Sequence, residues 1–365
     1  MVILHIAPIN MHQANGLRFS VPGLTSAQNK IKGVKAALLN VGLPKDLDLE
    51  EVSNFDFEFF GGYEDFQHLP GPFNAPDIFI FHGVYFLRYI KLYKKLLKLH
   101  IPYVVVPRVS LTEGAQKQKY LKKRIGNLIL FNKFINSASR IHYLTENEKI
   151  LSSSFNINSF IVGNGIRLPI ISERQSSKNI NITFIGRYDL NHKGLDILVD
   201  SLINIKSDLI NKNVKVRFFG SDFRRGKEYI KNKIEEHNME NVLIINDAVY
   251  GEEKHLILLD TDIFIATSRF EGHPMAVIEA MAYGIPCILT KGTNMLDKII
   301  EYDSGWPTEL DKNEIGNTII LALTNKDDII KKGINARRLV EQNYTWSKIA
   351  NETVDNYRNI IEVRK

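Results

Sequence analysis

The stretch FIATSRFEGHPMAVIEAMAYGIPCIL, from Phe264 to Leu289, determines the predicted fold. The apolar run Ile263–Ala266 is typical of a buried strand, and a polar bend follows it. Apolar residues then recur at helical spacing. Pro274 is at the expected first helical position, and Gly284 is at the expected stop. A second apolar run, Ile285–Leu289, predicts the next strand. A strand–loop–helix–strand unit of this kind is typical of a parallel sheet.

Two carboxylates lie within this unit, Glu271 in the loop and Glu279 inside the helix. Because helix neighbours are three or four residues apart, Glu279 is expected on the same face as Met275, one turn from the N-terminus. The amides of Met275 and Ala276 are expected to be free there. The site would then offer two acceptors for sugar hydroxyls and a positive dipole end for phosphate, as a nucleotide-sugar requires.

The segment EGHPMAVIE, residues 271–279, resembles the signature of retaining glycosyltransferases of family 4, in the glycosyl transferases group 1. Ser268-Arg269-Phe270 before it and the residues up to Pro286 after it strengthen the resemblance. A loop glutamate and a solvated helix glutamate are the alternative interpretation. The resemblance covers nearly the whole chain and is strongest over 180–310. It implies the α/β fold called GT-B, with two Rossmann-like domains whose parallel sheets face across a cleft, and an enzyme of the bacterial surface-polysaccharide type.

The domain boundaries follow from the same resemblance and from composition. Residues 1–168 would form an N-terminal acceptor-binding domain, and 180–345 a C-terminal nucleotide-sugar-binding domain. The polar segment 169–179, PIISERQSSKN, marks the linker between them. Residues 346–365 resemble the C-terminal helix of the family, which crosses back onto the first domain.

A pair of cations is expected at the diphosphate of the donor. A strand from Ile182 breaks at Gly186, and Arg187 and Lys193 flank the turn before a helix that begins at Leu195. Paired cations in such a turn suit a diphosphate. In the family, the matching residues hold the diphosphate and offset charge on the leaving group.

The resemblance also assigns the two glutamates. Glu279 would accept hydrogen bonds from the ribose hydroxyls, and Glu271 would contact the donor hexose near the reacting carbon. Whether Glu271 acts as a nucleophile or orients the sugar stays open. The other residues expected at the donor are Gly16, Gly186, Ala248, Val249, His273, Pro274, Met275 and Ala276.

Less specific signals occur near the N-terminus. The strand Val2–Ala7 runs into a polar loop with Asn15 and Gly16, where glycine would allow close approach of a phosphate or an acceptor. An ordinary turn glycine is the alternative. Residues 25–41 are predicted to be helical.

One strand end departs from the family pattern. After the strand Ile101–Val106 the family carries a histidine–glycine pair, and the histidine lies near the donor sugar. Here Arg108 and Val109 occupy those positions. Arg108 is a candidate catalytic residue because its planar guanidinium suits oxyanions. His82 is a second candidate, and a structural role for Arg108 is the alternative.

Positive charge is concentrated in the first half of the chain. Of a net charge of +6, residues 1–168 contribute +8 (20 Lys/Arg, 12 Asp/Glu) and the remainder −2 (27 Lys/Arg, 29 Asp/Glu). Much of the excess lies in Arg88–Lys98 and Lys117–Arg124. The first segment predicts an amphipathic helix that either lies on an anionic membrane or packs its apolar face on a sheet. No basic motif of a known nucleic-acid reader is present, so nucleic acid is not an expected partner.

Composition also indicates the compartment. No apolar run reaches the roughly 20 residues of a spanning helix, and the N-terminus lacks the features of a signal peptide. A single cysteine, Cys287, excludes an internal disulfide. The protein is expected in the cytoplasm, either free or peripheral to the inner face of the membrane. The triplets Asp46-Leu-Asp48 and Asp260-Thr-Asp262 provide too few oxygen ligands for a divalent ion, so no metal site is expected.

The expected function is metal-independent transfer of a hexose-type sugar, with retention, from a UDP- or GDP-sugar to a saccharide acceptor. The acceptor is expected to be linked to polyprenyl diphosphate, as in capsule or O-antigen assembly, with a soluble acceptor as the alternative. No cofactor is expected besides the donor. The rival interpretations are a nucleotide-sugar epimerase of the same two-domain shape and a non-catalytic nucleotide-sugar binding protein.

Overall fold

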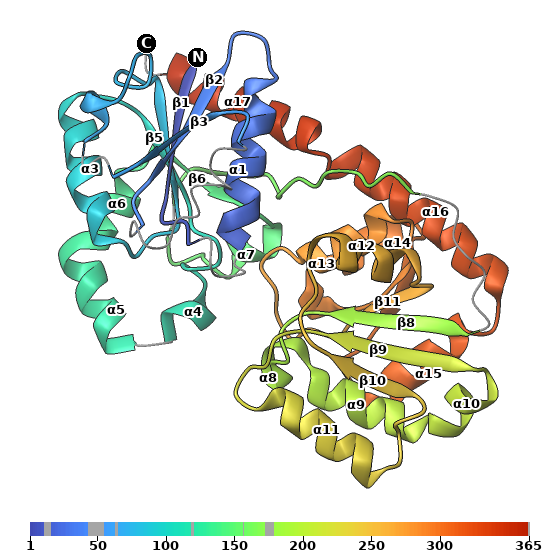
Figure 1. Cartoon of the computed structure of the whole chain (residues 1–365). Coiled ribbons are helices and arrows are strands. Elements are labelled where there is room, and N and C mark those ends of the chain that lie inside the picture. The colour runs from blue at the N-terminus through green and yellow to red at the C-terminus, as the bar shows by residue number, and fades with distance from the viewer. Residues whose placement is uncertain are drawn as a thin grey trace. The chain divides into compact units, whose positions relative to one another are not determined.

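The structure is a computed structural model that describes residues 1–10, 16–42, 55–62, 65–117, 120–155, 157–171 and 179–363. It divides into two compact units (Figure 1). Unit 1 comprises Met1–Gly165 together with Thr345–Lys365, and unit 2 comprises Ile166–Tyr344. Asn15 and the Asp46-Leu-Asp48 triplet lie outside the described residues.

Unit 1 contains a seven-stranded parallel sheet in the order β3-β2-β1-β4-β5-β6-β7. Its strands are β1 (Val2–Ala7), β2 (Lys35–Asn40), β3 (Glu58–Gly61), β4 (Ile78–His82), β5 (Tyr103–Val106), β6 (Arg140–Tyr143) and β7 (Ser159–Ile161). The central strands are buried along their length, as expected for a parallel sheet that is covered on both faces. The strand order reverses between β1 and β4.

Helices cover both faces of this sheet. They are α1 (Gly16–Asn29), η2 (Phe66–His68), α3 (Leu87–Lys98), α4 (Glu113–Lys117), α5 (Tyr120–Gly126), η3 (Asn127–Phe131), α6 (Asn132–Asn136), α7 (Glu146–Ile150) and α17 (Trp346–Glu362). The C-terminal helix α17 packs Val354, Tyr357 and Ile360 into one of the cores of unit 1. Gln28 on α1 donates to Thr353 on α17 at 3.0 Å. Residues from the two ends of the chain therefore share one core.

The helix predicted over residues 25–41 is wrong. Helix α1 ends at Asn29, and residues 35–40 form β2, which pairs in parallel with β1 and β3. The segment KAALLN contains good helix formers, but its buried position between two strands outweighs that local preference. Gly16 begins α1, and Pro22 lies inside this helix, which concealed its start in the sequence.

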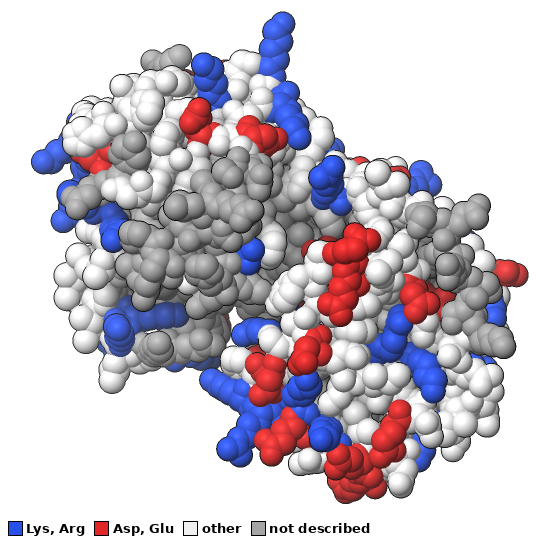
Figure 2. All heavy atoms as spheres, in the orientation of Figure 1, with Lys and Arg blue, Asp and Glu red and all other residues white. Residues whose placement is uncertain are grey.

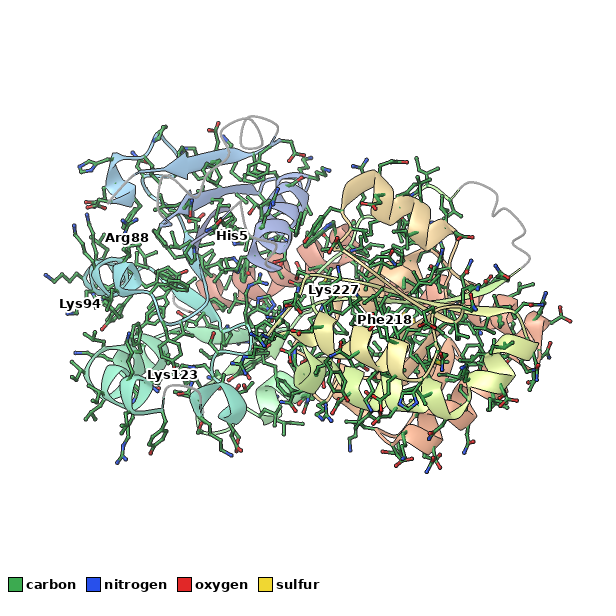
Figure 3. All side chains as sticks on the ribbon, turned by 60° about the horizontal axis from the view of Figure 1, so that its bottom comes forward. His5, Arg88, Lys94, Lys123, Phe218 and Lys227 are labelled. Atoms are coloured by element: carbon green, nitrogen blue, oxygen red, sulfur yellow. The ribbon has the colours of Figure 1, made fainter. Side chains whose placement is uncertain are left out.

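The basic helix α3 buries its apolar face. Tyr89, Ile90, Tyr93 and Leu96 are buried, so packing on the sheet is the interpretation that the structure supports. Lys91, Lys94 and Lys98 are exposed, and Figure 3 shows Lys94 pointing outward at the margin of unit 1.

Unit 2 contains a six-stranded parallel sheet in the order β10-β9-β8-β11-β12-β13. Its strands are β8 (Ile180–Ile185), β9 (Val214–Phe219), β10 (Leu243–Asn246), β11 (Ile263–Ala266), β12 (Cys287–Thr290) and β13 (Gly305–Thr308). The strand–loop–helix–strand unit predicted around 264–289 is confirmed as β11, α13 (Met275–Ala282) and β12, with Ile265 paired to Ile288. The order reverses between β8 and β11, the point at which open α/β sheets bind ligands.

Two cores lie on the two faces of this sheet. Ile263 and Ile265 of β11 belong to one core, and Phe264 belongs to the other, as the two-residue period of a strand requires. The remaining helices are α8 (Leu190–Lys193), α9 (Leu195–Asn204), α10 (Lys206–Asn211), α11 (Gly226–Glu236), α12 (Gly251–Leu259), η4 (Lys291–Thr293), α14 (Leu296–Glu301), α15 (Lys312–Ala322) and α16 (Lys326–Asn343). Two Rossmann-like units with parallel sheets confirm the predicted α/β class.

Two further features concern the single cysteine and the hydropathy of the helices. Cys287 is fully buried in β12, and desolvation raises the pKa of its thiol, so the group is a packing element. Among the described residues, no helix has both the length and the hydropathy that crossing a bilayer requires.

Candidate functional site

The loops that follow β8 and β11 meet at the reversal point of the unit 2 sheet. Gly194, between α8 and α9, has a φ of +64°, which a side chain would disfavour. A Cβ at this position would lie 2.1 Å from the carbonyl oxygen of Thr267, directly after β11. Glycine therefore allows the α8–α9 junction to close onto the end of β11, and it places Lys193 beside the loop that carries Glu271.

Lys193 and Glu271 form an ion pair in which the Lys193 ammonium donates to Glu271 Oε1. Ser268 Oγ donates to the same oxygen at 2.9 Å, and both charged side chains are mostly buried. Asn294, after β12, donates to the carbonyl oxygens of Glu271 and Gly272 and so fixes the loop. Two of the predicted site residues are thus brought into direct contact.

His192 lies among these charges and was not predicted. Burial lowers the pKa of its imidazole; Glu271 opposes this shift, whereas Lys193 and Arg187 add to it. Its ring packs 4.4 Å from the ring of Phe270, and its Nδ1 is buried without a hydrogen-bond partner in the described part of the chain. The neutral ring therefore presents an unused nitrogen next to the ion pair.

Arg187 follows Gly186 at the end of β8. Its guanidinium stacks over the ring of Phe223, with 4.9 Å between Cζ and the ring centroid. Across the described residues, no carboxylate lies within ion-pair distance of it. Arg187 is therefore a cation that is held in place but not neutralised, as an anion site requires.

A second residue that the sequence did not reveal is Arg269. It forms a bidentate pair with Asp196 at 2.8 and 2.7 Å, and it also donates to the carbonyl oxygens of Leu190 and Asn191. These bonds tie the loop after β11 to α8 and α9. In the sequence, this arginine is visible only as part of the Ser268-Arg269-Phe270 segment. Its pairing with Asp196 could not be predicted, because Asp196 stands 73 residues earlier.

The start of α13 differs in part from the prediction. Pro274 is the residue before the helix, not its first residue, and the Met275 amide donates to the carbonyl oxygen of His273 at 2.9 Å. The expectation of a free Met275 amide is therefore wrong, because His273 closes a tight turn. Its Nδ1 also lies 3.4 Å from Met275 Sδ. In the described structure, the Ala276 amide has no backbone partner, so one of the two predicted donors remains.

Glu279 lies one turn further along α13 and pairs with Lys254 on α12. It lines a pocket of about 760 Å³ in unit 2. The other lining residues are Ile166, Arg167, Leu168, Pro169, Ile170, Gly251, Glu252, Lys254, His255, Leu258 and Tyr283. Arg187, Lys193 and Glu271 are not among them, so the four predicted residues fall into two groups, with only Glu279 in this pocket. Ala248 and Val249 lie between β10 and α12, and Val249 is buried.

Arg108 belongs to a buried polar cluster at the reversal point of the unit 1 sheet. His5 on β1 contacts His82 on β4 at 2.9 Å and Gln28 at 2.8 Å, and Figure 3 shows His5 inside the unit. Arg108 Nη2 lies 3.3 Å from His82 Nδ1, and burial lowers the pKa of Arg108 to about 10. These contacts are those of a structural arginine; a role for Arg108 at the donor stays a prediction.

Glu148 completes the surroundings of Arg108. Thr145 Oγ1 accepts the Glu148 amide at 3.1 Å and so caps the N-terminus of α7, which is one half of a capping box. The Glu148 carboxylate instead accepts the backbone amides of Val109 and Leu144. Burial raises the pKa of this carboxyl group, and the two amides and Arg108 oppose the shift.

We expect this cluster to make the protein acid-sensitive. Burial lowers the pKa of His5, and of His142 on β6, to about 4, and it lowers the pKa of His82 well below the ordinary value of 6.5. Because the unfolded chain binds protons more readily, stability is complete above pH 6.5 and falls as the pH drops towards 4. At pH 5 the loss is on the order of 2 kcal/mol per histidine. Thermal denaturation at pH 7 and pH 5 measures it.

The histidine variants provide the control for this prediction. His142→Gln removes one of the three titrating histidines and should shrink the difference between the two pH values by about a third. His68→Gln, at an exposed position in η2, should leave the difference unchanged. Equal acid sensitivity of wild type and His142→Gln would contradict the prediction.

The acidic residues of the second triplet make contacts within the protein. Asp260 pairs with Arg217 at 2.6 Å, and Asp262 accepts the Asn181 amide at 2.8 Å. Within the described ranges, no group of three or more His, Cys, Asp or Glu side chains is arranged to hold a metal ion.

Two units, each with a doubly wound parallel sheet, define the GT-B class of α/β fold. Solved structures agree: Anabaena Alr3699/HepE in complex with UDP and glucose superposes with a TM-score of 0.74 at 14% identity, over 98% of this chain and 100% of that one. Sucrose-phosphate synthase from Thermosynechococcus elongatus gives a TM-score of 0.72 at 13% identity, with complete coverage of both chains. At these identities the likeness concerns the fold alone.

Residues 170–345 match the family described as "Glycosyl transferases group 1". Phosphatidyl-myo-inositol mannosyltransferase of Propionibacterium freudenreichii is 27% identical over 216 residues, 55% of this chain and 51% of that relative. An uncharacterized glycosyltransferase of Methanocaldococcus jannaschii is 24% identical over 50% of this chain and 45% of its own. The chain thus spans about half the length of these curated relatives. The family match and the names of the relatives support a transferase.

Proposed function

We propose that this protein is a retaining glycosyltransferase that moves a hexose-type sugar from a nucleotide-diphosphate donor to a saccharide acceptor. The observation that carries the proposal is the contact of Lys193 with Glu271 beside the unneutralised Arg187, at the reversal point of the unit 2 sheet. Open α/β sheets bind nucleotides at this point. The match to a glycosyltransferase family covers the same residues.

Cations at this edge would meet the main chemical demand of the reaction. The bond between the anomeric carbon and the diphosphate oxygen breaks, a bond to the acceptor oxygen forms, and the acceptor proton passes to the departing diphosphate. Negative charge grows on that leaving group, and preorganised positive groups stabilise it. In the proposal, Arg187, Lys193 and the Ala276 amide do this without a metal ion. Glu271 contacts the sugar, as a nucleophile or as an orienting group.

Lys193 must change partners when the donor binds. In the structure its ammonium is neutralised by Glu271. A diphosphate that approaches Arg187 would draw Lys193 towards it and leave Glu271 free to accept hydroxyls of the sugar. Glu279 and Lys254 line the neighbouring pocket, where the carboxylate could accept the ribose hydroxyls. Ala248, Val249, His273, Pro274 and Met275 belong to the same edge and are proposed to frame the nucleotide.

The proposed acceptor is a saccharide linked to polyprenyl diphosphate, used in the assembly of a surface polysaccharide at the cytoplasmic face of a membrane. The excess of positive charge in residues 1–168 supports it, because a polyprenyl diphosphate and its membrane are anionic. A putative colanic acid biosynthesis glycosyltransferase of Escherichia coli is 27% identical over 31% of this chain. A soluble acceptor is the alternative.

Thermal-shift screening with nucleotide-sugars, followed by a hydrolysis assay, tests the proposal. A donor at 100 times its Kd should stabilise the protein by about 2.7 kcal/mol. Without acceptor, slow hydrolysis to the sugar with the same anomeric configuration is expected. Binding without any turnover would favour the non-catalytic binding protein, and release of an epimerised sugar would favour the epimerase.

A further inference from the structure

The helical segment 120–131 of unit 1 presents an apolar face to solvent. Its exposed fractions are 72% at Leu121, 59% at Ile125, 82% at Leu128 and 67% at Ile129. The spacing of i, i+4, i+7 and i+8 places these four side chains, called the apolar stripe below, along one side of α5 and η3. Unlike the apolar face of α3, this one is not covered by the residues of unit 1 that the structure describes. Contiguous exposed leucine and isoleucine mark an interaction surface.

The segment is anchored to unit 1 through its other side. Helix α6 continues the segment and buries Phe134 and Ile135 in the core. Lys123 turns inward, donates to the carbonyl oxygen of Ala115, and lies 5.1 Å from the ring centroid of Tyr85. Asn127 donates to Gln116 at 3.1 Å. The stripe is therefore part of a packed helix whose outward side is apolar.

Charge around the stripe has a single sign. No Asp or Glu stands between Glu113 and Glu146, whereas that interval contains Lys117, Lys119, Lys122, Lys123, Arg124, Lys133 and Arg140. At 100° per residue, Lys122 and Arg124 flank the stripe on its two sides. Figure 2 shows basic side chains and none of the acidic ones on the visible face around α4 and α5, whereas both signs are mixed over unit 2.

An aromatic residue begins the segment. The Tyr120 ring is exposed and lies 5.8 Å from the Arg124 guanidinium, and its hydroxyl accepts from Arg124 Nη1 at 3.2 Å. Tyrosine and arginine side chains with an apolar body and a polar tip suit the boundary between lipid and water. The composition of this surface is therefore that of a helix lying in a membrane interface.

We propose that the apolar stripe and its flanking cations dock unit 1 onto an anionic phospholipid bilayer. Leucine and isoleucine side chains enter the boundary between headgroups and acyl chains, while Lys122 and Arg124 meet lipid phosphates. A second copy of the chain is a poorer occupant, because two such faces would bring like charges together. The inference rests on the proposed function in that a lipid-linked acceptor gives the docking its purpose.

Vesicle co-sedimentation of the full chain tests the docking. Wild type is expected to sediment with phosphatidylglycerol-containing vesicles at low salt, more weakly at high salt, and little with phosphatidylcholine alone. The variant Leu121→Ser/Ile125→Ser/Leu128→Ser/Ile129→Ser should partition at least about tenfold less. The matched control is Ile330→Ser/Ile334→Ser, which changes two exposed isoleucines on α16. A wild type that stays in solution, or a stripe variant that sediments like wild type, would overturn the proposal.

Charge is tested separately with Lys122→Glu/Arg124→Glu against Lys212→Glu/Lys312→Glu, two exposed lysines of unit 2. Only the first pair should abolish binding to anionic vesicles.

Size-exclusion chromatography of the stripe variant accompanies both assays, and a change from dimer to monomer would overturn the proposal in favour of self-association. Donor hydrolysis without lipid distinguishes the docking proposal from the proposed enzymatic function. Vesicle binding without hydrolysis would support the docking and contradict the enzyme, whereas hydrolysis without vesicle binding would support the enzyme and contradict the docking.

Discussion

Lys193→Ala is expected to lower kcat by ~30- to 1000-fold, which corresponds to a loss of about 2–4 kcal/mol of transition-state stabilisation. The KM for the donor should change by less than about threefold. The difference arises because Lys193 is already paired with Glu271 in the free protein. Binding the donor exchanges one anion for another, whereas charge on the departing diphosphate grows only as the bond breaks. Steady-state kinetics with a nucleotide-sugar measures both constants.

The control for this variant is Lys212→Ala, an exposed lysine at the opposite edge of the same sheet, before β9. Its kinetics should match those of wild type. Lys193→Arg keeps the charge but changes its geometry and should recover part of the lost rate. Full turnover by Lys193→Ala would contradict the proposed role of Lys193 in stabilising the departing diphosphate.

Glu279→Ala should weaken donor binding by ~10- to 100-fold, with a smaller effect on kcat. A hydrogen bond from a sugar hydroxyl to a carboxylate contributes about 1.5–3 kcal/mol, and the ribose keeps this bond in both ground and transition states. Titration calorimetry with the nucleoside diphosphate measures the effect independently of turnover.

Two variants separate ribose binding from the ion pair with Lys254. Glu252→Ala removes another carboxylate that lines the same pocket and should change the Kd by less than about twofold. Lys254→Ala frees Glu279 from its partner and should weaken binding less than Glu279→Ala does. Equal losses in Lys254→Ala and Glu279→Ala would indicate that the ion pair only supports the structure.

The fold was predictable where the spacing of apolar residues agrees with the positions of proline and glycine. Around residues 264–289, an apolar run, a proline, helical spacing and a glycine all indicate one topology, and the structure has it. The prediction failed over 25–41, where alanines and leucines favour a helix but the segment is enclosed between two strands. Local preference does not reveal which neighbours a segment will have.

The candidate site was predictable one residue at a time, but its contacts were not. The sequence predicted Lys193 and Glu271 as separate donor contacts, and their direct pairing depends on the approach of Gly194 to β11. His192 and Arg269 were missed as site residues because their partners come from loops distant in sequence. No local pattern distinguishes such residues from ordinary loop polar groups.

The central claim is that Arg187 and Lys193 recognise the diphosphate of the donor, and one titration tests it most directly. Calorimetry compares the Kd of a nucleoside diphosphate with that of the nucleoside monophosphate, in wild type and in Arg187→Ala/Lys193→Ala. Wild type should prefer the diphosphate by at least about tenfold, or 1.4 kcal/mol, and the double variant should lose most of that preference. A double variant that retains the full preference would contradict the account.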